Sequence, residues 1–179
     1  MRIGVMLAAI VFPAVAAAQA PPLEFKGLRF GLATESDVKE RLGLELVCSG
    51  IPLYTCRAEP DGLTYADEHA KSFTFDFIDG KLASVTVVLI HRASRDRLAD
   101  TIAQKYGRRI SNTTEPMKHW TTGAPYMQRR QQWRLTGGIL ELQDNEPPVD
   151  MLLVIASGNA KLRWYSEQRR SKPKAKSDM

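Results

Sequence analysis

The sequence predicts an α+β fold, in which an antiparallel sheet carries two short helices on one face. Two segments, one after Thr34 and one after Ser94, show the capping residue, acidic first turn and terminal glycine of a helix. Each is followed by alternating, strand-like sequence with hairpin turn signals. The 179 residues, 44% hydrophobic and 25% charged, fall in the range of ordinary globular domains, which excludes a disordered or collagen-like chain.

The N-terminus predicts a secretory signal peptide over residues 1–18. A short positive start at Arg2 precedes an apolar stretch over 3–12 and a run of small residues over 14–20. Cleavage is expected near Ala18, because the alternative site at Ala20 would leave Pro21 first. An uncleaved anchor is the other interpretation, but the apolar stretch is shorter than the ~20 residues that span a bilayer. The leader style indicates a bacterial protein that is periplasmic or secreted.

The net charge of +5 resides at the two ends of the chain. Arg2 belongs to the leader, and residues 169–179 carry a net charge of +4, so residues 19–168 are formally neutral. We therefore expect one domain over 19–168, followed by a basic disordered tail over 169–179. Neither specific nucleic-acid binding nor a transmembrane segment is expected of the mature chain.

The two cysteines, Cys48 and Cys56, predict a disulfide. Cysteines of exported proteins meet an oxidising compartment, and Gly50 and Pro52 between them favour a turn that returns the chain to bonding distance. A redox couple is the alternative, but the sequence has no C-x-x-C.

The first helix is expected to start after its cap Thr34 and end at Gly43, with Val38 and Leu42 on one face. Strands are predicted to follow over 44–48, 53–58, 73–77 and 81–90. The last two form a hairpin around Asp79-Gly80. A bulge near Ala83-Ser84 would bring the valines of 81–90 onto the phenylalanine face and bury more apolar surface.

The second helix is expected after its cap Ser94 and ends at Gly107. Strands are predicted over 131–143, with a bulge or bend at Gly137-Gly138, and over 151–157 and 161–166, on either side of Gly158-Asn159. Residues 111–130 are expected to be the least structured interior stretch. The chain thus contains two helix-then-strands units, and whether they are true duplicates stays open.

Residues 25–34, followed by Asp37-Val38 and Leu42-Gly43, resemble the opening of small exported bacterial modules. These are the modules found in outer-membrane-assembly lipoproteins and β-lactamase-inhibitor proteins. The resemblance covers about twenty residues and implies a helix-plus-antiparallel-sheet module used for protein binding. Unlike the lipoproteins, this chain has no cysteine after its apolar leader, and the matched positions carry no functional residue over.

No arrangement typical of a catalytic or metal site is present in the sequence. The three histidines are far apart, and Asp67-Glu68-His69 is the only tight cluster of acids with histidine. That cluster lies in a stretch, 59–71, that reads as a solvated loop. We therefore expect no catalytic residues, no metal and no cofactor.

Two features predict binding. The stretch 118–130 contains residue types that are enriched at interface hot spots, namely Trp120, Tyr126, Arg129 and Arg130. Its aromatic residues could instead anchor the loop to the core. The tail carries five cations that would contact anionic surfaces weakly, and these are Arg169, Arg170, Lys172, Lys174 and Lys176.

We therefore predict an exported, non-catalytic domain that binds another protein or an envelope component. One alternative is an envelope hydrolase that uses Asp67, His69 or His91 after folding brings them together. The other is tail-mediated binding to anionic surfaces.

Overall fold

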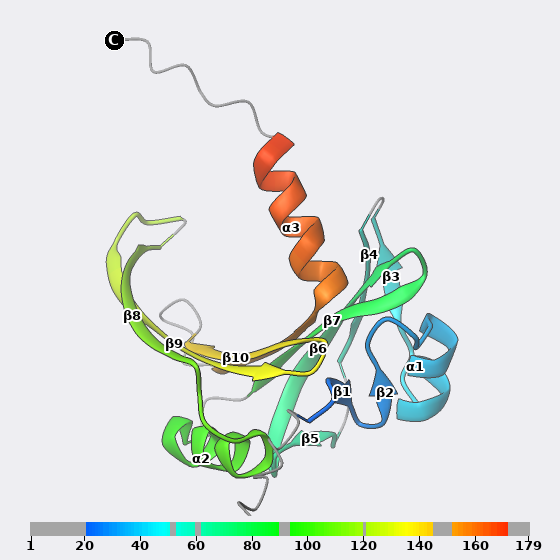
Figure 1. The fold of residues 1–179 in the computed structure, drawn as a ribbon, viewed down its shortest axis with the longest axis horizontal. Helices are drawn as coiled ribbons and strands as arrows, with labels where there is room; N and C mark the ends of the chain where they lie inside the picture. Colours follow the sequence, from blue (N-terminus) through cyan, green and yellow to red (C-terminus); the bar gives the residue numbers. More distant parts are fainter. Residues whose placement is uncertain are drawn as a thin grey trace, which may run out of the picture.

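A computed structural model describes residues 21–50, 53–59, 62–89, 94–119, 121–144 and 152–171. The predicted signal peptide and residues 172–179 lie outside this part. Within it, three helices accompany a mostly antiparallel sheet, which confirms the α+β class (Figure 1). Among the described residues, no helix is both long enough and apolar enough to cross a membrane.

The elements fall into two consecutive groups, and in each group most of the strands follow a helix. In the first group they are β1 (Glu24–Phe25), β2 (Leu28–Arg29), α1 (Glu35–Leu42), β3 (Val47–Ser49), β4 (Tyr54–Ala58), β5 (Thr64–Tyr65), β6 (Glu68–Ile78) and β7 (Lys81–Leu89). In the second group they are α2 (Arg95–Tyr106), β8 (Ser111–Lys118), β9 (Pro125–Leu135), β10 (Gly138–Asp144), β11 (Leu152–Gly158) and α3 (Asn159–Ser171).

The main sheet consists of two meanders joined at its centre. Its strand order is β3-β4-β6-β7-β11-β10-β9-β8, so each helix is followed by strands that run inward from one edge to the middle. The last strands of the two groups, β7 and β11, pair antiparallel from Ser84↔Ser157 to Leu89↔Leu152. The predicted plan of two helix-plus-strands units therefore describes the strand order, with α3 as an addition.

The two faces of the sheet differ in polarity. One face carries the core, where Phe73, Phe75 and Phe77 of β6 pack with Val85 and other buried side chains under α1, α2 and the β1–β2 hairpin. The opposite face is concave. Figure 1 shows the sheet bending at both ends toward α3, which stands on this second face.

The β6–β7 hairpin has the predicted bulge. Phe77 pairs with Leu82, but Asp76 pairs with Ser84, which leaves Ala83 as the extra residue. The shift places Val85 opposite Phe75, and both are fully buried. Asp79 and Gly80 both have positive φ, as a type I′ turn requires.

Both predicted helix starts and stops are confirmed. The Thr34 hydroxyl accepts a hydrogen bond from the Asp37 N–H, and the Asp37 carboxylate in turn accepts from Thr34. Gly43 closes α1 in the left-handed conformation. Ser94 caps α2, and Gly107 ends it.

The segment before β1 is part of the fold. Leu23 donates its N–H to the Thr136 carbonyl, and Thr136 donates to the Pro21 carbonyl, so the chain enters beside the β9–β10 turn. Leu23 and Phe25 are both about 95% buried, and the Phe25 ring lies 5.6 Å from that of Phe73. The predicted cleavage near Ala18 leaves these contacts intact.

Two predictions for the second unit were wrong. Residues 161–166, expected to form a strand, lie in α3, and this helix includes the first three residues of the expected tail, 169–171. Residues 111–130, expected to be the least structured stretch, form most of the β8–β9 hairpin. Gly137, expected at a bulge or bend within the stretch 131–143, lies in the turn that divides this stretch into β9 and β10.

The segment 59–71 also differs from the expected loop. Two short pairings, Thr64↔His69 and Tyr65↔Glu68, form a hairpin around Ala66 and Asp67, both of which have positive φ. The solvated-loop prediction was therefore wrong for this stretch, because β6 starts at Glu68.

Candidate functional site

The concave face presents two rows of half-buried side chains that we call the concave ladder. Residues directly paired across neighbouring strands lie on the same face, so the register defines each row. The first row is Thr74, Thr86, Ile155, Glu141 and Gln132; the second is Ser72, Val88, Leu153, Gln143 and Arg130. Seven of these ten residues carry polar groups, so the ladder offers many hydrogen-bonding groups to a partner.

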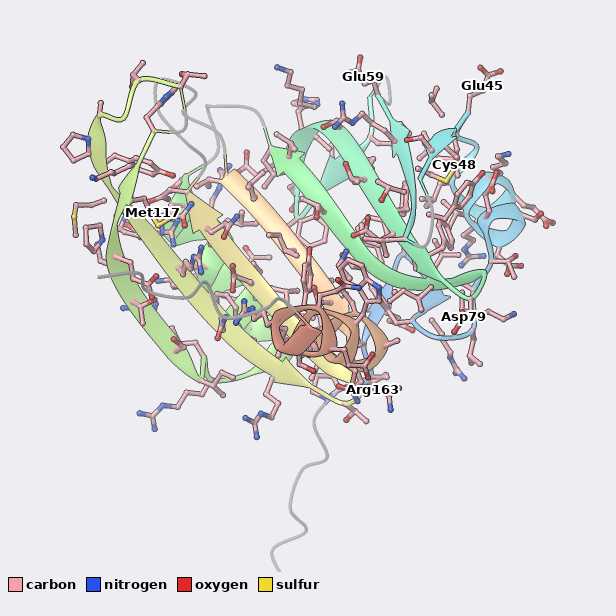
Figure 2. All side chains as sticks on the ribbon, turned by 90° about the horizontal axis from the view of Figure 1, so that it is seen from above. Glu45, Cys48, Glu59, Asp79, Met117 and Arg163 are labelled. Carbon is pink, nitrogen blue, oxygen red and sulfur yellow. A yellow bond between two sulfur atoms is a disulfide. The ribbon has the colours of Figure 1, made fainter. Side chains whose placement is uncertain are left out.

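A third row on the same face is covered by α3. Asp76, Ser84 and Ser157 pair across the sheet in that row, and all three are more than 90% buried. The Lys161 ammonium of α3 lies 2.7 Å from the Asp76 carboxylate, which also accepts from the Thr55 hydroxyl at 2.8 Å. Figure 2, which looks down on this face, shows α3 near one end of the strands, so the ladder beside it is left open.

The predicted binding residues are divided between the two faces. Tyr126 and Arg130 lie at alternate positions of β9 on the concave face, where the Arg130 guanidinium donates to the Gln128 side chain at 2.8 and 3.0 Å. Arg129, between them, faces the other side. Trp120 lies outside the described residues. The predicted binding region is therefore one edge hairpin, and it supplies Arg130 to the concave ladder.

Arg129 belongs to a charged cluster that secures α2 to the sheet. Its Nε lies 3.1 Å from the Asp144 carboxylate, which is also ion-paired with Arg95 of α2. Arg95 is buried and donates as well to the carbonyls of Arg129 and Leu142. Burial lowers the pKa of the Arg95 guanidinium, and the Asp144 charge opposes that shift. The Arg129 side chain is therefore used in a contact within the protein, to Asp144.

The acid and histidine cluster does not assemble into a site among the described residues. Glu68 is the buried member, and its carboxylate pairs with Arg97 of α2. His69 is exposed and, as the next residue along β6, points to the opposite face, while Asp67 lies in the turn. His91 lies outside the described residues. Neither Asp67 nor His69 lines any of the four described pockets.

The disulfide prediction is confirmed, since Cys48 and Cys56 are bonded and face each other across β3 and β4. The Glu35 carboxylate of α1 lies within 4.8 Å of both sulfurs. A soft metal ion would need thiolates as ligands, and in this structure both sulfurs are used by the disulfide. Glu35 instead pairs with Lys39 at 2.6 Å, which lowers the pKa of its carboxyl group.

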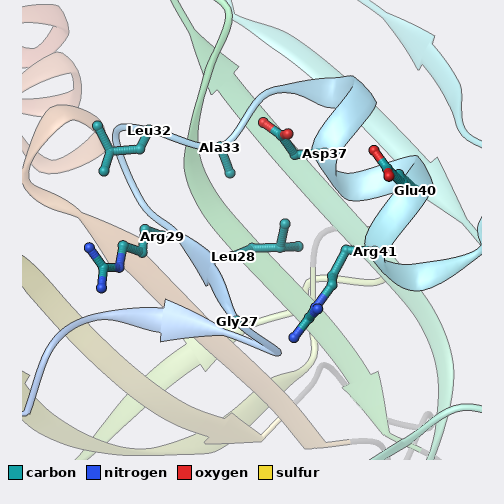
Figure 3. Close-up of a pocket in the computed structure, with 8 residues that line it drawn as sticks. All are labelled: Gly27, Leu28, Arg29, Leu32, Ala33, Asp37, Glu40 and Arg41. Atoms are coloured by element: carbon teal, nitrogen blue, oxygen red, sulfur yellow. The ribbon is translucent and has the colours of Figure 1, made fainter.

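A pocket of about 650 Å³ lies between the β1–β2 hairpin and α1 (Figure 3). Two cations, Arg29 and Arg41, and two anions, Asp37 and Glu40, share its lining, so its formal charge is balanced. Asp37 is committed to the α1 cap, and Arg41 donates to the Lys26 carbonyl. The lining therefore favours no class of ligand.

The ladder was not recognised from the sequence. Its signal is the polar half of the alternation in the central strands, where Thr74 and Thr86 alternate with buried apolar residues. Alternation of this kind also describes any solvent-facing sheet surface. Only the bend of the sheet and the position of α3 distinguish this face.

Comparison of the chain with protein families, with curated proteins and with solved structures found no match. The similarity to exported bacterial modules thus stays a prediction.

Proposed function

We propose that the chain is an exported, non-catalytic binding domain, and that the concave ladder is its contact surface for another protein or an envelope component. The observation that supports the proposal is the contrast along one face of the sheet. The row that contains Asp76 is covered by α3. The two adjacent rows of the concave ladder, which mix polar and apolar residues, remain half exposed.

The composition of the ladder suits a polar interface. Threonine, glutamine and arginine side chains offer donors and acceptors, and Ile155, Leu153 and Val88 supply apolar area at its centre. The ladder rests on a continuous hydrogen-bonded sheet, so its side chains are held in position before a partner arrives, which lowers the entropic cost of binding.

The test is capture of a partner from envelope extract by two variants that add the same cation. Thr86→Arg places a bulky charge in the centre of the ladder, and Gln104→Arg places one on the exposed side of α2. Recovery with the wild type and Gln104→Arg but not with Thr86→Arg supports the proposal. Equal recovery with all three proteins removes the concave ladder as the contact surface.

A second pair of variants separates the two neighbouring arginines of β9. Arg130→Ala removes a ladder side chain, whereas Arg129→Ala removes the contact to Asp144. The proposal expects weaker partner recovery from Arg130→Ala. Arg129→Ala is expected to lower stability and to leave recovery by the folded fraction unchanged.

A further inference from the structure

A second pocket, of about 440 Å³, lies on the opposite side of the sheet from the concave ladder. It is formed where the middle of α2 covers the start of β8 and part of β9. Its lining comes from α2, from the connection that follows it and from the two strands, and consists of Ala99, Asp100, Ala103, Arg108, Arg109, Ile110, Ser111, Asn112 and Trp133. The small side chains of Ala99 and Ala103 leave the space under α2 open.

The two arginines of this pocket have no ion-pair partner among the described residues. Arg108 and Arg109 are exposed and form neither an ion pair nor a side-chain hydrogen bond with any described residue. By contrast, Arg95, Arg97 and Arg129 are each paired with a carboxylate.

Asp100 is the only acid in the lining, so the pocket carries a formal net charge of +1. The C-terminus of α2 adds about half a negative charge nearby, which the two guanidinium groups outweigh.

The wall of the pocket contains a buried donor without an acceptor. Trp133 is fully buried, and its indole Nε1 has no hydrogen-bond partner among the described residues. An indole N–H can only donate, so what completes it is an acceptor. The Asn112 amide adds a further donor to the same lining.

We infer that this pocket binds an oxyanion group, a phosphate or a carboxylate, carried by a small ligand. Guanidinium groups form bidentate hydrogen bonds with both anions, which accounts for two unpaired arginines at the mouth. The Asn112 amide of β8 adds a neutral donor beside them, and the buried Trp133 indole forms part of the wall. The proposal is independent of the concave ladder, because the two surfaces lie on opposite faces of the sheet.

The competing explanation for the unpartnered Trp133 N–H is a contact within the protein itself. Gln131 lies two residues before Trp133 on the same face of β9, and its side-chain oxygen is also buried without a partner. A small rearrangement that joins these two groups would satisfy both and leave no donor for a ligand.

The experiment follows the indole N–H signals of the full mature chain by NMR. The chain has three tryptophans, and the Trp133 signal is assigned with Trp120→Phe and Trp164→Phe. Inorganic phosphate and succinate are titrated separately, each against sodium chloride of equal ionic strength. We expect a saturable shift of the Trp133 signal with at least one of the two anions, and the one that acts identifies the ligand class.

Three variants decide the assignment. Arg108→Ala with Arg109→Ala is expected to weaken binding by about 10-fold or more, and Ala103→Leu is expected to abolish it by filling the space while both charges remain. Arg134→Ala, on the other face of β9, is the matched control and keeps full affinity. An unchanged Trp133 signal, or a shift that sodium chloride or the double variant reproduces, would overturn the proposal and leave the Gln131 pairing as the explanation.

Discussion

Lys161 of α3 and Asp76 of β6, which are 85 positions apart in the sequence, form a buried ion pair with 2.7 Å between Nζ and Oδ2. The Lys161 ammonium also lies 4.8 Å from the centre of the Tyr165 ring. The pair lies at the end of α3 that rests on the sheet, and the helix from Tyr165 to Arg169 is exposed.

Removing one partner of this pair should be strongly destabilising. Asp76→Asn would leave the Lys161 charge buried without a counterion, and we expect a loss of about 3–5 kcal/mol in the free energy of unfolding. Lys161→Met combined with Asp76→Asn should cost less than the sum of the single variants, because neither charge is then stranded. Urea denaturation of the four proteins measures the coupling, and strictly additive effects would show that the pair does not act as a unit.

The disulfide should contribute stability without shaping the site. It closes a short loop between β3 and β4, at the edge of the sheet remote from the second pocket. Reduction is expected to lower the free energy of unfolding by about 2–3 kcal/mol. Mass spectrometry should show a gain of two hydrogens on reduction, and an unchanged mass would disprove the bond in the purified protein.

The segment from Pro21 to Phe25 should be essential to the fold, whereas residues 1–18 should not. A chain that starts at Gln19 is expected to unfold at the same urea concentration as the full-length chain. Phe25→Ala removes a ring packed against Phe73 and Phe75 and should cost about 3–5 kcal/mol. Glu24→Ala, at the exposed neighbouring position, is the control and should stay within about 0.5 kcal/mol of the wild type.

Acid should weaken the N-terminal cap of α1. Hydrogen bonds from the Thr34 backbone and hydroxyl lower the pKa of the Asp37 carboxyl group below its ordinary value. A lowered folded-state pKa adds stability above the unfolded pKa, and that stability is lost as the pH falls through the folded value.

Asp37→Asn should therefore be less stable than the wild type at neutral pH, and the difference should shrink as the pH falls below about 4. Thermal unfolding across this pH range measures the effect. A constant difference between the two proteins at all pH values would contradict the role of the carboxylate.

The basic tail should bind anionic membranes only through charge. Deleting residues 172–179 removes three lysines and leaves the described part of α3 in place. Each lysine near an anionic surface contributes about 1 kcal/mol, so the deletion should weaken binding to anionic vesicles by about 100-fold at low salt. Binding by the intact chain should fall as salt rises, and equal binding by both chains at every salt concentration would remove the tail from this function.

Local signals in the sequence predicted the first unit well. The cap at Thr34, the Asp79-Gly80 turn and the bulge at Ala83 depend on residues close to each other in the chain. The second unit was harder to predict. β8 is an edge strand with almost no buried side chains, so no alternation of apolar and polar residues reveals it.

The sequence did not predict the helix α3, for a different reason. Leu162 and Trp164 alternate with polar residues and therefore mimic a strand, while the buried position of the first helical turn is a lysine. The need for that lysine becomes visible only once Asp76 lies beneath it. For the same reason the concave ladder, whose rows combine five strands, could not be derived from spacing.

The junction of the two meanders at β7 and β11 bears on how the chain folds. Contacts within each meander join strands that are neighbours in sequence, apart from the short β5 insertion, so each can form with little loss of chain entropy. The β7–β11 ladder instead brings residues 84 and 157 together and closes the longest loop in the sheet. This favours a folding order in which the two meanders form separately and then dock late, along the β7–β11 strand pair alone. The docking step creates the concave face and the surface on which α3 packs.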